Sequence, residues 1–127
     1  MTITPISHLE NQALDWAVSK ALGYSIDQSN NDFYVHIHGR THPLSKLNYH
    51  NNWDLSGPIL DQEEIHLCTS NGKGYFIGEE VNGLRWLARY RDGLNEIGRT
   101  PIEAFLRAFV VKKLQLASSI EIPNGLA

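Results

Sequence analysis

Histidines are the side chains of this sequence best suited to chemistry. His36 and His38 lie in residues 33–38 (FYVHIH), whose alternation of apolar and polar side chains predicts a β-strand. Residues two apart on a strand project from the same face, so both imidazoles could bind one zinc ion, with His42 or His50 as a third ligand. No acid follows at the spacing that zinc hydrolases use. A metal-dependent hydrolase is therefore the third hypothesis for function, and a solvated face of polar side chains is the simpler interpretation.

A row of arginines forms the second pattern of chemical interest. The segment LRWLARYR predicts another strand, and Arg85, Arg89 and Arg91 share one of its faces. Guanidinium groups at this spacing can follow a phosphate backbone, and Tyr34 and Trp53 could stack on bases if they lay nearby. The acidic chain and the leucine that interrupts the row favour a solvent-facing strand whose arginines pair with neighbouring acids. Nucleic-acid binding is therefore the second hypothesis, and nucleic acid is not the favoured partner.

No complete catalytic constellation accompanies these patterns. Cys68 follows His66 by two residues, and on a strand their side chains run parallel instead of meeting as a nucleophile and its base must. Lys73 lies in a glycine-containing turn, but the sequence has neither a GxxxxGK[ST] nor a GxGxxG phosphate loop. We therefore expect no cofactor and favour a non-enzymatic role.

Trp16 and Trp53 are the remaining candidates for a binding site. Trp16 points away from the main apolar stripe of its predicted helix, and Trp53 lies in a polar segment, directly before Asp54. Tryptophan is enriched at the energetic centres of protein interfaces and is also common in cores. Either the two rings pack together in a small cluster, or an exposed ring marks a partner-binding surface that includes Asp54.

Two helices are predicted to frame these residues. The first spans Ser7 to Gly23, with Ser7 as its N-cap and Gly23 as a left-handed C-terminal residue. The second spans Thr100 to Leu114, with Thr100 as its N-cap and a wide apolar face. The dipeptide Gly57-Pro58 predicts a break in the middle of the chain.

The strands are predicted to form one small sheet. Asn71-Gly72 indicates a hairpin between residues 65–69 and 75–77, and residues 120–122 can add a short edge strand. Residues 25–32 are polar and indicate a loop. We therefore expect an α+β fold, in which about four antiparallel strands carry both helices on one face.

Length and composition restrict the class of protein. A chain of 127 residues with 42% apolar residues is expected to form one domain, residues 1–127. The net charge of −3 and the single Cys68 favour neither an anionic partner nor a disulfide framework. Because the sequence shows neither a membrane-spanning apolar run nor a signal peptide, we expect a cytoplasmic protein without a membrane partner.

Three blocks in a fixed order carry a family resemblance. They are SHLENQALDWAVSKALG, WDLSGPILDQEEI and TPIEAFLRAFVVKKL, and together they resemble the NinX-like family of small phage and prophage proteins. The resemblance implies an accessory protein that acts in the bacterial cytoplasm, and it brings no catalytic residues. Residues 24–52 and 83–99, which hold the histidines and the arginines, depart from the family pattern.

The favoured hypothesis for function is a non-enzymatic module that binds a host or phage protein. It follows from the missing catalytic constellation, from the two tryptophans and from the resemblance to accessory proteins. A homodimer is a further expectation, since the edge strands 33–38 or 120–122 can pair across a two-fold axis.

Overall fold

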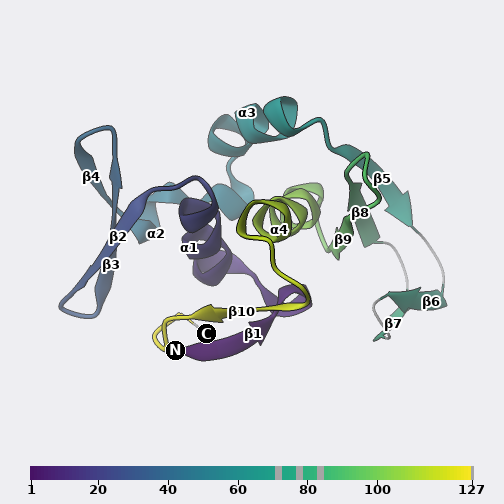
Figure 1. Ribbon diagram of the computed structural model, residues 1–127, viewed down its shortest axis with the longest axis horizontal. Coiled ribbons are helices and arrows are strands. Elements are labelled where there is room, and N and C mark those ends of the chain that lie inside the picture. The colour runs from purple at the N-terminus through teal and green to yellow at the C-terminus, as the bar shows by residue number, and fades with distance from the viewer. Residues whose placement is uncertain (71–72, 77–78, 83–84, 127) are drawn as a thin grey trace.

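Packed helices form the centre of the fold (Figure 1). The computed structural model describes residues 1–70, 73–76, 79–82 and 85–126. Helix α1 (Asn11–Ala21) packs against helix α4 (Pro101–Leu114), and α3 (Trp53–Glu63) also contacts α4. Among the described residues, no helix combines the length and the apolar character needed to cross a membrane.

The strands pair antiparallel in small sheets around these helices. The two-stranded sheets are β1 (Thr2–Pro5) with β10 (Ser119–Ile122) and β6 (Lys73–Phe76) with β7 (Glu79–Asn82). The first three-stranded sheet contains β2 (Ser25–Ser29), β3 (Asp32–Ile37) and β4 (Arg40–Pro43). The second contains β5 (His66–Ser70), β8 (Arg85–Arg89) and β9 (Asn95–Gly98).

This arrangement confirms the α+β class and the edge strand at residues 120–122. Within the described residues the strands form four sheets, where the sequence predicted one sheet of about four strands. Figure 1 shows the reason, because α1 and α4 lie between the two three-stranded sheets. Helix α4 contacts β8 and β9, whereas α1 contacts α4 and β2.

The start of the first helix differs from its prediction. Ile6–His8 form a 3-10 turn, η1, and α1 begins only at Asn11, so the prediction of Ser7 as N-cap is wrong. Ile6 and Leu9 are buried, and the Ile6 N–H donates to the Ser118 carbonyl at 2.9 Å. These contacts hold the 3-10 turn against the core, and the chain passes through the extended residues Leu9 and Glu10 before the helix begins.

Three predictions about the strands are also wrong. Residues 33–38 do not form an edge strand, because β3 lies between β2 and β4. Residues 25–32 are not a loop, because β2 and β3 form a hairpin whose turn residues Asn30 and Asn31 have φ of 51° and 67°. Asparagine tolerates this left-handed conformation, which a two-residue hairpin turn needs. Strand β5 pairs with β8, and β6 pairs with β7, so residues 65–69 and 75–77 are not hairpin partners. Asn71-Gly72 lie outside the described residues.

The middle of the chain is more helical than predicted. A short helix α2 (Leu44–Leu47) and a 3-10 turn η2 (Tyr49–Asn51) lead into α3. Gly57-Pro58 lie inside α3, so the predicted break is wrong. Pro58 has no N–H to donate to the carbonyl of Asp54. Because Asp54 is exposed, water can donate to that carbonyl instead.

The closing helix confirms its prediction. Thr100 caps α4 by accepting a hydrogen bond from the Glu103 N–H at 3.1 Å, and Pro101 is the first helical residue. Strand β9 then packs directly on the helix backbone. A Cβ at Gly98 would lie 2.5 Å from the Ala104 nitrogen, so this contact requires glycine.

A buried ionic network connects α4 to the beginning of the chain and to β9. Arg107 donates from Nε to the Leu9 carbonyl and from Nη1 to the Ile97 carbonyl, each at 2.9 Å. Its Nη2 lies 3.1 Å from Oε1 of Glu103, which also accepts from the Arg99 backbone N–H at 3.0 Å. Three segments of the chain therefore depend on one guanidinium group.

Glu96 on β9 lies beside this network and is expected to make stability depend on pH. Burial raises the pKa of Glu96 from 4.5 to about 7, although the charge of Arg107 opposes the shift. Between these values the folded protein holds a proton that the unfolded chain has lost, so the free energy of unfolding falls as pH rises. We expect Glu96 to contribute a loss of about 2 kcal/mol between about pH 5 and pH 8, measured by urea unfolding.

The variant Glu96→Gln removes this titration and should remain nearly as stable at the upper pH as at the lower one. The control is Glu121→Gln, which replaces an exposed carboxylate on β10 and should follow the wild type. Parallel losses of stability in wild type and Glu96→Gln would show that Glu96 does not hold the proton.

Candidate functional site

An exposed apolar surface occupies the first turn of α3. The side chain of Trp53 is 45% exposed and that of Leu55 is 37% exposed. The other large apolar residues exposed in the described part of the chain, Met1 and Ile3, lie at the N-terminus and in β1. We use the term α3 surface for Trp53, Asp54 and Leu55.

The indole of Trp53 is held in place by a ring in helix α4. It stacks on the ring of Phe105 in α4, with ring centroids 5.8 Å apart and an angle of 26° between the planes. Phe105 is fully buried, so one side of the indole is packed while much of the ring remains exposed. The ring partner of Trp53 is therefore Phe105 and not Trp16.

The backbone before Trp53 is fixed by side-chain hydrogen bonds. Asn52 is the N-cap of α3, and its Oδ1 accepts from the Asp54 N–H at 3.0 Å. The buried Ser56 hydroxyl donates to the Tyr49 carbonyl at 2.6 Å, which connects α3 to η2. Both contacts orient the first turn of α3 without covering it.

A buried carboxylate anchors η2 to α1. Asp15 is fully buried, accepts from the His50 backbone N–H at 3.0 Å, and lies 2.8 Å from His50 Nδ1. Burial raises the pKa of Asp15, although its interactions with His50 oppose the shift. Burial also raises the pKa of the neighbouring Tyr49 to about 12. This pair fixes the segment from which Trp53 emerges.

The exposed side of α3 is acidic as well as apolar. Asp54 and Asp61 are exposed on the helix, and Glu64 is exposed directly after it. The helix contains no basic residue. A partner of this surface would therefore have to bring apolar groups and positive charge.

Trp16 does not contribute to an exposed surface. Only 7% of it is accessible, and it packs in the main core of the protein. Lys20, one turn later on α1, places its Nζ 5.6 Å from the centre of the Trp16 ring. Although Trp16 points away from the main apolar stripe of this helix, it is thus part of the core.

The histidines do not converge. Strand β3 ends at Ile37, and His38 has φ of 48° in the following turn, so the prediction that His36 and His38 share a strand face is wrong. His36 pairs with Asp27 at 2.5 Å, and the His38 ring lies edge-on to another aromatic ring, Tyr24. His42 lies on β4 opposite Val35 in the register. Across the described ranges, no group of at least three potential metal ligands comes together.

The arginines remain near one another on the β5–β8–β9 sheet. Arg85 and Arg89 lie on the same face of β8, and Arg91 follows the end of the strand. Arg91 lines a hollow of about 390 Å³ together with Glu64, Ile65 and His66. The proposed stacking residues lie elsewhere, because Tyr34 belongs to β3 and Trp53 to α3.

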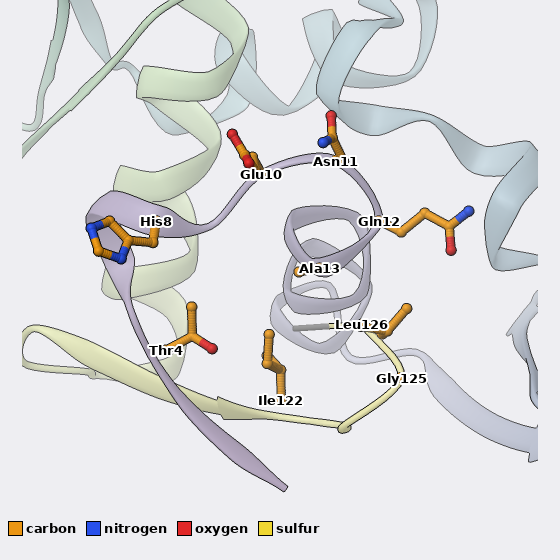
Figure 2. A pocket seen from close by; sticks show the side chains of 9 residues that line it. All are labelled: Thr4, His8, Glu10, Asn11, Gln12, Ala13, Ile122, Gly125 and Leu126. Carbon is orange, nitrogen blue, oxygen red and sulfur yellow. The ribbon is translucent and has the colours of Figure 1, made fainter.

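A second hollow, of about 330 Å³, lies at the start of α1 (Figure 2). Figure 2 shows His8, Glu10, Asn11 and Gln12 along the entry to this helix, and strand residues with the C-terminal turn below them. Glu10 forms an ion pair with Arg99. Because a helix N-terminus favours negative charge, the Glu10 carboxylate satisfies this preference within the chain itself.

Comparison with known proteins identifies the family. The family model described as bacteriophage P22 NinX matches residues 5–113. The chain belongs to the bacteriophage P22 NinX family. The match spans residues 24–52 and 83–99, so the histidine and arginine segments lie within the NinX region. No curated protein matches the chain. Membership of this phage family indicates a phage accessory protein, without an assigned activity or partner.

Sequence reasoning missed one residue of the α3 surface and one pair of residues that supports it. The exposure of Leu55 was not predicted, and helical periodicity places its side chain on a different side of α3 from that of Trp53, two positions earlier. The pair of Asp15 and His50 was also missed, because its members lie 35 positions apart. The only signal for this pair was an acid between the apolar positions of a predicted helix.

Proposed function

We propose that this NinX-family protein is a non-enzymatic phage accessory protein that binds a host or phage protein in the bacterial cytoplasm. The α3 surface is the proposed contact. The observation that carries the proposal is an indole that is stacked on a buried ring and still 45% exposed. An exposed apolar side chain, Leu55, follows it after one residue.

The stacking of Trp53 favours binding for an entropic reason. A side chain that is already fixed loses little rotational freedom when a partner covers it. Tryptophan residues in desolvated pockets often contribute about 2 kcal/mol or more to an interface. A pocket on the partner that receives Trp53 would use this advantage.

The charges of α3 restrict the chemistry of the partner. Asp54 and Asp61 favour a basic rim around an apolar pocket, because like charges at an interface are costly. A host or phage protein with Lys or Arg around an apolar groove fits this surface. No observation favours a metal-dependent hydrolase as a second function.

The proposal predicts a partner that depends on Leu55. Tagged wild-type protein should capture one protein from phage-infected cells in stoichiometric amount, and nuclease treatment should not remove it. Leu55→Ser should lower the affinity about tenfold or more, which corresponds to about 1.4 kcal/mol. Quantitative mass spectrometry of the captured protein, followed by titration of the purified pair, measures both effects.

Ile3→Ser is the matched control, because Ile3 is 68% exposed and lies on β1, away from α3. It should capture the partner as well as the wild type does. Equal losses in both variants, or a captured protein that disappears with nuclease, would contradict the proposed role of the α3 surface.

A further inference from the structure

The β5–β8–β9 sheet has one covered face and one outer face. Helix α4 covers the face that carries Ala88 and Glu96, and both residues are buried. Side chains alternate along a strand, so the residues between these positions point to the outer face. There the register places His66 of β5 and Asn95 of β9 on either side of Arg89.

The charged residues at the described positions of this outer face are positive. They are Arg85 and Arg89, with Arg91 at the end of the strand, in a chain whose net charge is −3. Within the part of the chain that the structure describes, neither Arg89 nor Arg91 forms an ion pair. This is unlike the cations of the closing segment, which pair with carboxylates: Arg99, Arg107, Lys112 and Lys113.

The expectation that the arginines would pair with neighbouring acids therefore does not hold for Arg89 and Arg91. Both are exposed, and the hollow beside β8 adds the imidazole of His66 to the guanidinium of Arg91. Glu64 lies in the same hollow and opposes an anion there.

We propose that the outer face of the β5–β8–β9 sheet binds the phosphate backbone of nucleic acid. Guanidinium groups donate several hydrogen bonds to phosphate oxygens and keep their charge at every physiological pH. Arg89 and Arg91 are the principal contacts, with His66 beside them. At its described positions in β5, β8 and β9 the outer face bears no Phe, Tyr or Trp on which bases could stack. The proposed contact is therefore with the charged phosphates and not with the bases, and duplex nucleic acid is the preferred ligand.

The test is fluorescence anisotropy of a labelled mixed-sequence duplex titrated with purified full-length protein between about 50 and 200 mM salt. Wild-type protein should bind at low salt and weaken steeply as salt rises. The double variant Arg89→Gln, Arg91→Gln should lose at least tenfold in affinity, and the slope of log K against log salt should fall by about two, one for each lost phosphate contact.

A matched control keeps the net charge equal. Arg40→Gln with Lys46→Gln removes two exposed cations from β4 and α2, on another part of the protein, and should bind like the wild type. Glu64→Gln should bind more tightly, because it removes the carboxylate from the hollow. This set leaves the α3 surface intact, so its outcome is independent of the protein partner.

Three outcomes would overturn the proposal. Wild-type protein could fail to bind at low salt, or the Arg89→Gln, Arg91→Gln variant could bind as well as the Arg40→Gln, Lys46→Gln control. Equal binding of poly-glutamate in place of the duplex would assign the face to an acidic protein and not to phosphate.

Discussion

Arg107→Met is expected to lower the free energy of unfolding by about 4 kcal/mol, because it removes one side of a buried ion pair. The side chain of Arg107 is 6% exposed and makes contacts with Leu9, Ile97 and Glu103. Methionine fills a similar volume but leaves the Leu9 and Ile97 carbonyls without this donor. The Glu103 carboxylate keeps its contacts with the backbone and side chain of Arg99. Urea unfolding followed by tryptophan fluorescence measures the loss.

Two further variants separate charge from geometry at this position. Arg107→Lys keeps the charge but offers one donor group where the guanidinium offers several, so it should lie between wild type and Arg107→Met. Arg40→Met replaces an exposed arginine on β4 and should change stability by no more than about 0.5 kcal/mol. A loss below about 1 kcal/mol in Arg107→Met would contradict the structural role assigned to the network.

Asp15→Ala is expected to cost about 3 kcal/mol of stability, since it leaves the His50 donors without their buried acceptor. The carboxylate is fully buried and accepts from both the backbone and the ring of His50. Its loss should also loosen the segment that leads to Trp53. Urea unfolding measures the loss of stability, and quenching of tryptophan fluorescence by acrylamide measures the loosening of this segment.

A double-mutant cycle with His50→Gln tests whether Asp15 and His50 act as a pair. If they do, the double variant should be more stable than the sum of the single losses predicts, by about 1 kcal/mol or more. Asp32→Ala changes an exposed aspartate at the start of β3 and should have little effect. Additive losses in the cycle would contradict the coupling.

Local sequence patterns predicted the elements whose causes are local. Thr100-Pro101 with Glu103 marks the start of α4 because all three act within one turn. The alternation in β3 and β8 identifies both strands and their faces. The prediction for the start of α1 was wrong because its cause is not local. Ile6 and Leu9 make buried contacts with distant segments, and these contacts determine where the chain becomes helical.

The candidate site was predictable only in part, for the same reason. Trp53 was recognisable as a large apolar residue in a polar setting, but its exposure depends on Phe105, which is 52 positions further along the chain. The prediction of a histidine cluster was wrong because His38 has a left-handed backbone conformation, which turns the chain away from the strand. Burial and turn conformation at these residues follow from tertiary contacts that no spacing in the sequence encodes.

The most direct measurement of the central claim is site-specific photo-crosslinking in phage-infected cells. A photoreactive amino acid placed at Leu55 should give one discrete covalent adduct with a host or phage protein, because the α3 surface lies in the contact. The same group at Ile3, which is exposed on β1, should give no such adduct. Adducts of equal yield from both positions, or none from Leu55, would contradict the claim that this surface binds a partner protein.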